Sequence, residues 1–310
     1  MALVSVIIPC YNQAHYLNDA IESILAQSCA DFEIVVVDDG SADNTAEVAA
    51  GYPGVRCIRQ DNQGLAAARN TGLRESRGDY LVFLDADDRL LPGALEAGLA
   101  CLLAHSEYAF VSGHYRYIKE DGSLLNEYPQ EKIEEDHYLA FLQGNYVGMH
   151  ATVMYRRTAL EQVGGFNTSL RACEDYDLYL RLSRQFPISR HQEIVAEYRQ
   201  HGTNMSGNAE LMLKTALAVL RSQRQYVKAN KHYRQAYKVG LSFWQEFYGE
   251  KLLAQFDSLR ACGEGKQAAG KVLILLRYAP RYLAGCMVSR ILECGSRVLQ
   301  TVLPAPIYRR

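Results

Sequence analysis

The sequence predicts an α/β protein in which a mainly parallel sheet is flanked by helices and followed by a helical C-terminal extension. Over the first hundred residues, short apolar segments rich in β-branched and aromatic residues alternate with amphipathic segments. Nearly continuous apolar segments suit strands buried on both faces, and the strand–helix–strand order implies right-handed crossovers between parallel strands. After about residue 209 the pattern is helical, apart from a loop near residues 261–267.

The elements of the first hundred residues can be assigned in chain order. The expected strands cover residues 3–8, 33–38, 55–60 and 80–85. The expected helices, each with an apolar face, cover residues 14–27, 42–50, 65–75 and 91–104. In open parallel sheets, ligands bind beyond the carboxyl ends of the strands. We therefore expect the polar segments PCYN, DDGSADN, DNQGLAAARN and DADD, which follow these strands, to lie together at one edge of the sheet.

Residues 105–208 have a mixed pattern of short strands, tyrosine-rich segments and loops marked by glycine. The segment HATVMYRRTAL, residues 150–160, predicts a strand that turns into a helix. EDYDLYLRLSRQF, residues 174–186, predicts an amphipathic helix, and EIVAEYRQH, residues 193–201, predicts a further strand.

Composition limits the possible partners and compartments. The 310-residue chain has a formal net charge of −2, so no overall positive field would attract nucleic acid, and no nucleic-acid partner is expected. Its eight cysteines show no CxxC spacing, which indicates a reducing compartment and no structural zinc. The start, MALVSVIIPC, predicts a strand rather than a signal peptide, and no run of about 20 apolar residues predicts a membrane span. We expect a cytoplasmic protein.

Three carboxylates follow the expected strand 80–85, which ends in the segment FLDADD. Asp85 and Asp87 are two residues apart, so in extended geometry their side chains point to the same side. A divalent cation such as Mg²⁺ or Mn²⁺, with diphosphate oxygens completing its shell, would resolve their repulsion. The alternative is a turn in which Asp88 caps the helix that begins near Leu91.

A second alternative for this segment is an aspartyl-phosphate phosphatase of the haloacid dehalogenase type. Its pattern, D-x-D-x-[TV], is broken here by Arg89, and the segment lies after three strands rather than near the start. Nicotinamide and P-loop chemistry are disfavoured, because neither G-x-G-x-x-G nor a Walker lysine loop follows an expected strand.

Six motifs occur in order: VSVIIPCYN, EIVVVDDGSADNT, NQGLAAARNTGL, DYLVFLDADD, VGGF and EDYDLYLRL. Together they resemble the inverting nucleotide-sugar glycosyltransferases of family 2, which have a GT-A fold, over roughly residues 3–206. The resemblance implies a catalytic domain over residues 1–208, with a nucleotide-binding half (1–104) and an acceptor-binding half (105–208). Residues 209–310 would form the extension. It also implies a UDP-sugar donor, a divalent metal (Mn²⁺ or Mg²⁺) and a glycan or lipid-linked saccharide acceptor.

The resemblance gives roles to residues after the first two strands. Pro9, Tyr11 and Asn12 would line the nucleotide pocket, with Tyr11 near the base. Asp39 would accept a hydrogen bond from the uracil ring. Its alternative is a cap for the helix near Ala42.

Further donor-side roles follow from the later motifs. Arg69, on a helix whose N-terminus faces the site, would contact phosphate or organise the carboxylates. The alternative is a surface salt bridge. Asp85 would accept a hydrogen bond from the ribose or sugar, beside Ala86, and Asp87 would bind the metal. Gly165 and Phe166 would lie beneath the donor sugar.

The acceptor half would supply the general base. By resemblance Asp175 removes the proton of the acceptor hydroxyl as it attacks the anomeric carbon, and Glu174 orients the site. Without the resemblance, both would be first-turn acids that favour the helix dipole. Asp177 is expected to be exposed to solvent.

Three residues of this half have predicted roles outside the general base. His201 is the expected further metal ligand, and its alternative is an exposed loop residue. Tyr146 and His150 are expected to line the acceptor groove.

The C-terminal tail mixes basic and apolar residues. From residue 271 onward, one acid, Glu293, accompanies the basic residues Lys271, Arg277, Arg281, Arg290, Arg297, Arg309 and Arg310. A basic amphipathic helix suits an anionic membrane surface. Because the resemblance implies a glycan or lipid-linked saccharide acceptor, we expect peripheral contact with the inner face of the membrane and a role in polysaccharide or cell-envelope biosynthesis. The alternatives are packing on the catalytic domain or on a second subunit. A non-catalytic sugar-nucleotide-binding protein of the same fold is the alternative function.

Overall fold

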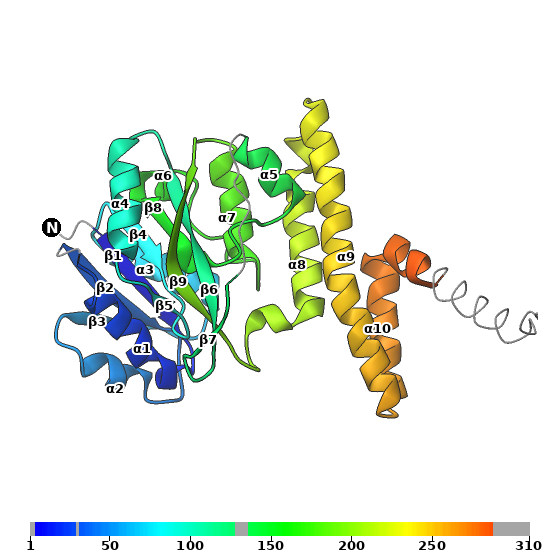
Figure 1. Cartoon of the computed structure of the whole chain (residues 1–310), viewed down its shortest axis with the longest axis horizontal. Helices are drawn as coiled ribbons and strands as arrows, with labels where there is room; N and C mark the ends of the chain where they lie inside the picture. The colour runs from blue at the N-terminus through cyan, green and yellow to red at the C-terminus, as the bar shows by residue number, and fades with distance from the viewer. Residues whose placement is uncertain (1–3, 29–30, 128–135, 288–310) are drawn as a thin grey trace, which may run out of the picture.

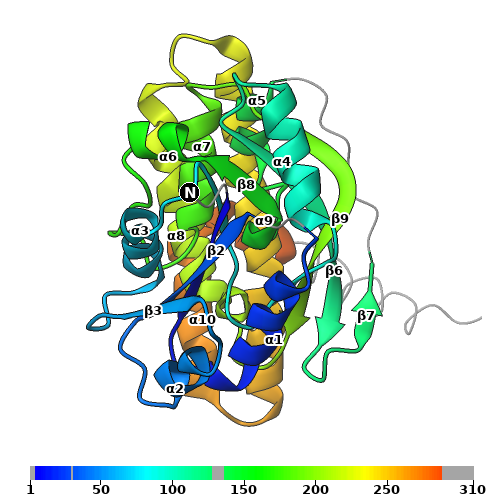
Figure 2. The ribbon, with the colours of Figure 1, turned by 90° about the vertical axis from the view of Figure 1, so that its left-hand side faces the viewer.

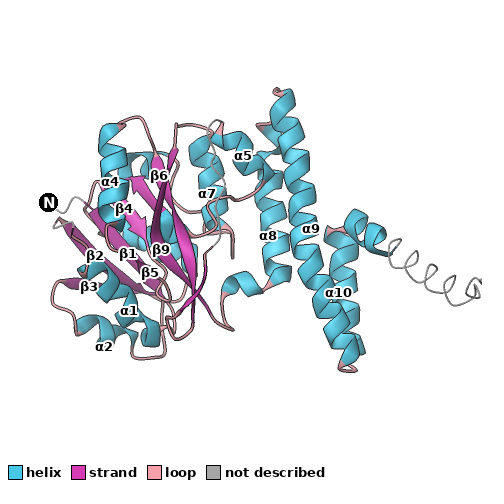
Figure 3. Ribbon diagram, viewed as in Figure 1, coloured by secondary structure: helices cyan, strands magenta, loops and turns pink. Residues whose placement is uncertain are grey.

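The computed structural model describes residues 4–28, 31–127 and 136–287. Figure 1 shows a sheet with helices on both faces beside a group of long helices. Figure 3 shows that the described strands all belong to the first part, whereas the described chain after residue 208 is helical. The predicted α/β class with a helical extension is confirmed over the described residues.

The first four strands form the parallel half of the sheet. They are β1 (Val4–Cys10), β2 (Phe32–Asp38), β3 (Val55–Arg59) and β4 (Tyr80–Phe83). They lie side by side in the order β3–β2–β1–β4, and each neighbouring pair is parallel. Cys10 lies opposite Asp38, so the segments that follow these strands leave the sheet at one edge, as predicted.

The helices between these strands begin where local hydrogen bonds allow. They are α1 (Ala14–Leu25), α2 (Thr45–Ala50), α3 (Leu65–Glu75) and α4 (Ala94–Ala104). α2 begins three residues later than predicted, because the Asp43 carboxylate accepts hydrogen bonds from the N–H and the hydroxyl of Thr45. α4 also begins three residues late. Residues Arg89–Leu90 form a short strand, β5, and Gly93 takes a left-handed conformation with φ 82°.

The second half of the sheet is mixed. Its strands are β6 (Phe110–Lys119), β7 (Leu124–Asn126), β8 (Val153–Arg156) and β9 (Ser189–Gln200). The order continues β4–β8–β6–β9–β5, with β7 paired to β6. β9 begins four residues before its predicted start and runs antiparallel to β5, next to the three aspartates. This pairing brings the ends of β4 and β9 together.

Three further helices are α5 (His137–Gln143), α6 (Arg157–Gln162) and α7 (Glu174–Ser183), the last ending three residues before its predicted end. Alternate side chains of β1 enter two cores. Val6 and Ile8 pack with Ile21 of α1 and Leu95 of α4, whereas Ile7 packs on the other face with the core that contains α3 and α7. Both faces of the parallel half are therefore buried, as its continuous apolar strands predict.

The extension consists of α8 (Ala209–Ser222), α9 (Lys231–Ala261), α10 (Gly265–Tyr278) and a helical segment over residues 280–287. In Figure 2, which views the molecule from the side of the sheet, α9 and α10 lie behind the sheet. One apolar core includes Phe83 of β4, Leu217 of α8, Leu252 of α9 and Leu283. The extension thus packs directly on the α/β part.

The helices and the basic tail bear on the expected relation of the protein to membranes. No described helix combines the length and the apolarity that a membrane span needs. The basic residues Arg290, Arg297, Arg309 and Arg310, and Glu293, lie outside the described residues.

Candidate active site

The segment after β1 is held in place by its own polar side chains. Pro9 is buried within β1. Asn12 has a left-handed conformation (φ 54°), and its side-chain oxygen accepts a hydrogen bond from the N–H of Ala42 at 2.8 Å. Tyr11, between them, is 51 % exposed, so its ring is free to contact a ligand.

Asp39 is buried after β2 and organises the loop before α3. Its carboxylate accepts hydrogen bonds from the Gln60 amide (2.7 Å) and from the N–H groups of Gln63 (3.0 Å) and Gly64 (2.8 Å). The alternative prediction, a cap for the helix near Ala42, is wrong, because the carboxylate faces the start of α3 instead. One of its roughly four lone-pair sites remains for a ligand.

Arg69 joins the donor-side and acceptor-side carboxylates. The guanidinium, 2 % exposed, donates to Asp85 at 2.7 Å and to Glu174 at 2.5 Å, and it lies 5.6 Å from the centre of the Phe166 ring. Although burial alone would lower the pKa of Arg69, the charges of Asp85 and Glu174 raise it above its usual value. The alternative of a surface salt bridge is wrong, and Arg69 joins two carboxylates, of which Glu174 lies 105 residues after Arg69 in sequence.

Asp175 follows Glu174 in the first turn of α7, where Arg69 holds Glu174. Burial, followed by the negative charge of Glu174, raises the pKa of Asp175 to about 6. A carboxylate with such a pKa is ionised at neutral pH and is still a much stronger base than an ordinary aspartate. The arrangement therefore provides one carboxylate that can accept a proton beside another that is neutralised by a cation.

Asp87, which follows β4, and His201, which follows β9, lie next to each other. His201 Nε2 lies 2.8 Å from Asp87 Oδ2, and the His201 side chain is 3 % exposed. The Gln13 and Asn204 amides lie 3.3 and 3.4 Å from the same oxygen. Burial, and then the charge of Asp85, raises the pKa of Asp87. The alternative for His201, an exposed loop residue, is wrong.

Sequence reasoning missed Arg199, which supports the DADD segment from behind. Its N–H donates to Asp88 at 2.9 Å and its guanidinium to the Asp87 carbonyl at 2.8 Å and to Asp19 at 2.6 Å. Asp88 is 3 % exposed and does not cap a helix, since the residue before α4 is Gly93; that alternative is wrong. A signal was available, because Arg199 lies in β9 two residues before His201, which follows that strand.

The loop before α7 is fixed by Asn70 and Arg181, which were also missed. The Asn70 amide pairs with the backbone N–H and carbonyl of Phe166, both at 2.8 Å. Arg181 donates to the Gly165 carbonyl at 2.7 Å and is paired with Asp177 at 2.7 Å. The predicted exposure of Asp177 is wrong, because this pair buries it to 5 %. The sequence contained a signal for this pair, because Arg181 lies four residues after Asp177 on the same helix.

The two predicted acceptor residues have different environments. His150 is 6 % exposed, and its ring nitrogens lie 3.2 Å from the Tyr179 hydroxyl and 3.5 Å from the Tyr155 hydroxyl. The structure places it in the core rather than along an open groove, because aromatic rings enclose it; burial lowers its pKa well below the usual value. Tyr146 is partly exposed and its hydroxyl lies 2.6 Å from His137 Nδ1.

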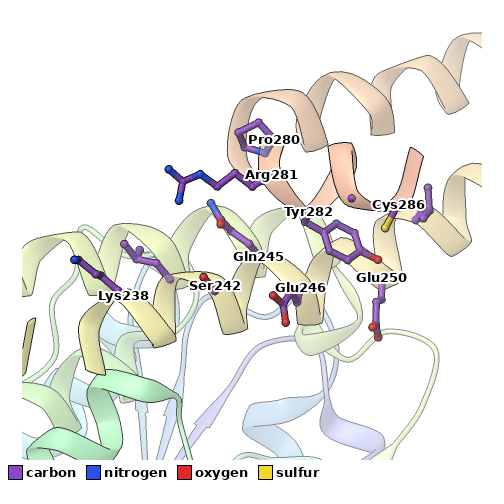
Figure 4. A pocket seen from close by; sticks show the side chains of 12 residues that line it. Lys238, Ser242, Gln245, Glu246, Glu250, Pro280, Arg281, Tyr282 and Cys286 are labelled. Carbon is purple, nitrogen blue, oxygen red and sulfur yellow. The ribbon is translucent and has the colours of Figure 1, made fainter. Parts of the chain in front are cut away.

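A cavity of about 1050 Å³ lies away from these residues, between α9 and the helical segment 280–287. Figure 4 shows Gln245, Glu246 and Tyr282 around it. Gln245 and Glu246 lie on a different face of α9 from Trp244 and Tyr248, which pack toward the core.

A metal ion would need ligands from outside the protein. Within the described ranges, no three His, Cys, Asp or Glu side chains are placed to hold one ion. Asp87 and His201 supply one carboxylate oxygen and one imidazole nitrogen. Mg²⁺ and Mn²⁺ sites in nucleotide-dependent enzymes commonly combine one or two protein ligands with phosphate oxygens. The pair therefore fits an ion that binds together with a diphosphate.

Comparisons with known proteins point to one family. The family model "Glycosyl transferase family 2" matches residues 5–164. The chondroitin synthase of Escherichia coli is 34% identical over 214 residues, covering 66% of this chain and 30% of that protein. The hyaluronan synthase of Pasteurella multocida is 32% identical over 209 residues, covering 66% of this chain and 21% of that protein. The chain thus spans about a third or less of the length of these relatives.

Two solved structures have a similar fold at low sequence identity. S. aureus TarS 1–349 in complex with UDP-GlcNAc has a TM-score of 0.64 and 17% identity, covering 91% of this chain and 83% of that chain. The mannosyltransferase PcManGT from Pyrobaculum calidifontis, in complex with GDP-Man and Mn²⁺, has a TM-score of 0.61 and 17% identity, covering 97% and 88%. The likeness confirms the predicted GT-A fold.

Proposed function

The chain belongs to glycosyl transferase family 2, and from that premise we propose that it transfers a sugar from a UDP-sugar to a saccharide acceptor with inversion at the anomeric carbon. The observation that carries the proposal is the buried bridge from Asp85 through Arg69 to Glu174. It holds the donor-side carboxylates and the base Asp175 in one fixed arrangement, as a single-displacement reaction requires.

Each group of residues has a place in the proposed reaction. Tyr11 and Asp39 contact the uracil ring of the donor, and Asp85 accepts a hydrogen bond from the ribose or sugar. Asp175 removes the proton of the acceptor hydroxyl, whose oxygen attacks the anomeric carbon opposite the leaving UDP. Glu174 stays paired with Arg69 and keeps the site oriented.

Asp87 and His201 would hold a divalent ion together with the donor. When bound, the ion neutralises the diphosphate and so helps UDP to leave. The Asp87 carboxylate already lies 2.8 Å from His201 Nε2, and the Arg199 guanidinium donates to the Asp87 carbonyl, so this pair needs little rearrangement.

Nucleotide binding is the first test. We expect UDP with Mn²⁺ to raise the melting temperature of the wild type, and the Asp87→Ala variant to lose the metal dependence. GDP and dTDP serve as competitors. If no nucleotide stabilises the protein with or without metal, the proposal fails.

Transfer is tested next with a panel of tetrasaccharides: cellotetraose, chitotetraose, chondroitin tetrasaccharide and hyaluronan tetrasaccharide. Asp175→Asn should bind UDP normally and lose transfer by about 10³-fold, within the usual contribution of a general base. A protein that binds UDP but transfers nothing, in any variant, would indicate the non-catalytic alternative. Phosphate release by Asp175→Asn at the wild-type rate would indicate the phosphatase alternative, in which Asp85 is the nucleophile.

Contact with a membrane surface is part of the proposal for the extension. Leu273 and Leu276 of α10 are 66 % and 54 % exposed and lie near Lys271, Arg277 and Arg281. Exposed leucines beside cations suit an anionic lipid surface. The protein should sediment with vesicles containing phosphatidylserine and stay in solution with phosphatidylcholine vesicles. Equal sedimentation with both would contradict this part.

A further inference from the structure

Helix α9 carries a group of four aromatic side chains, the α9 aromatic cluster: Phe243, Trp244, Phe247 and Tyr248. Trp244 and Tyr248 are buried (7 % and 5 % exposed) and stack with ring centres 5.6 Å apart and planes 11° apart. Phe243 and Phe247 stack at 5.8 Å and 19°, yet they are 42 % and 41 % exposed. The cluster therefore has a buried half and an exposed half.

The buried half lies against the start of α7. The Trp244 indole N–H donates to the Tyr176 hydroxyl at 3.4 Å, and Tyr176 follows Asp175 in sequence. Burial, and then the charges of Cys173 and Asp175, raises the pKa of Tyr248, so its hydroxyl is within electrostatic range of the proposed base.

The hydroxyl of Tyr248 is available for a ligand. Among the residues that the structure describes, no hydrogen-bond partner contacts it. Although Tyr248 is only 5 % exposed, its oxygen is not among the fully buried unpaired atoms, so a ligand hydroxyl could reach it and form a hydrogen bond.

The exposed half has the chemistry that a sugar ring requires. Phe247 packs edge to face on Tyr248 at 4.9 Å, and the Lys251 ammonium lies 4.5 Å from the Phe247 ring centre. A pyranose has an apolar C–H face that stacks on an aromatic ring, and hydroxyls that bond to polar groups at its edge. Exposed apolar patches beside polar groups commonly mark ligand grooves.

The position of the α9 aromatic cluster indicates whether it would bind the donor or the acceptor. The donor side of the site is marked by Asp85, on one side of Arg69, and the base lies on the other side, next to Glu174. Because Trp244 of the cluster contacts Tyr176, the neighbour of Asp175, a ligand on Phe247 and Tyr248 would approach from the side of the general base, where the nucleophilic hydroxyl must be presented.

We propose that the α9 aromatic cluster is the acceptor site, in which an acceptor pyranose stacks on Phe247 and the Tyr248 hydroxyl binds an acceptor hydroxyl near Asp175. This assignment rests on the proposed function. It makes the C-terminal extension part of the active site.

The chain has a built-in probe for this site, because Trp244 is its one tryptophan. Each tetrasaccharide of the panel is titrated into the wild type while tryptophan emission is recorded, and steady-state transfer is measured with the tetrasaccharides that are elongated. We expect an elongated tetrasaccharide to change the emission. Tyr248→Phe and Phe247→Ala should each raise the acceptor KM about tenfold, the loss expected for one hydrogen bond or one stacking contact.

Tyr226→Phe is the matched control, since it removes a hydroxyl from a 45 % exposed tyrosine of the same extension, next to Arg184 at the far end of α7. UDP binding should be unchanged in all three variants. Acceptor KM values within twofold of wild type in both cluster variants would overturn the inference, and so would an emission that no tetrasaccharide alters. If the wild type itself does not bind UDP, that result would instead contradict the proposed function.

Discussion

Replacing Arg69 with methionine removes the cation that Glu174 and Asp85 share, while keeping an apolar stem beside Phe166. The Glu174 side chain is 6 % exposed, so water cannot replace the lost cation. Asp85 is 33 % exposed and can be solvated. The main cost is therefore one buried carboxylate without a partner.

Breaking a buried ion pair by removing one partner costs about 3–5 kcal/mol of unfolding free energy. With an unfolding entropy of about 2.1 cal/mol/K per residue, a chain of 310 residues loses roughly 1.5 °C of melting temperature for each kcal/mol. Arg69→Met should thus melt roughly 5–8 °C below wild type at neutral pH. Arg74→Met, the same substitution on the exposed face of the same helix, should melt close to wild type.

Thermal melts at several pH values, with the double variant Arg69→Met/Glu174→Gln, separate this cause from a loss of packing. In the single variant, Glu174 is a buried carboxyl group without a cation, and burial favours the neutral form of such a group. The folded state then takes up a proton as the pH falls, so the deficit relative to wild type should shrink toward pH 4–5. The double variant should recover more than half of the loss. A deficit that is independent of pH, or a double variant no more stable than the single one, would refute the reasoning.

Three further outcomes are expected. Because ionised Asp175, with a pKa of about 6, is the proposed base, kcat/KM should fall about tenfold per pH unit below pH 6; a profile that is flat down to pH 5 would argue against this role. Gly165 has φ 69°, and an added Cβ would lie 2.6 Å from the Asn70 amide oxygen, so Gly165→Ala should lower the melting temperature more than Gly164→Ala, where φ is also positive (81°) but the space is open. Equal melts would contradict the close contact. His201→Ala should weaken the Mn²⁺ dependence of UDP binding about tenfold in thermal-shift titrations, and an unchanged dependence would exclude it as a ligand.

The sequence is sufficient to predict the strands and the edge at which the polar segments meet, because apolar runs and crossover rules act locally. It also predicts that Asp87 and His201 are polar neighbours of one site, through the family resemblance. The structure adds that Arg69 is buried between two acids, which depends on where the start of α7 lies relative to α3 and β4. No pattern within either helix specifies that packing.

The errors share a physical cause. Asp177 was expected to be exposed and Asp88 was considered as a helix cap, because each lies near an expected helix start, where acids are favoured without a partner. Their burial is stabilised by Arg181 and Arg199, and the second partner comes from a strand 111 residues away. Local propensity could not reveal a cation supplied by β9.

The shared Arg69 also matters for engineering new sugar specificities. A chimera that took residues 1–104 from one relative and the rest from another would separate Arg69 and Asp85 from the Glu174 with which they are matched. A graft that changed Glu174 to a neutral residue would leave the cation with a single, partly solvated partner. Donor specificity is therefore better altered by point changes around the pocket than by exchange of whole halves.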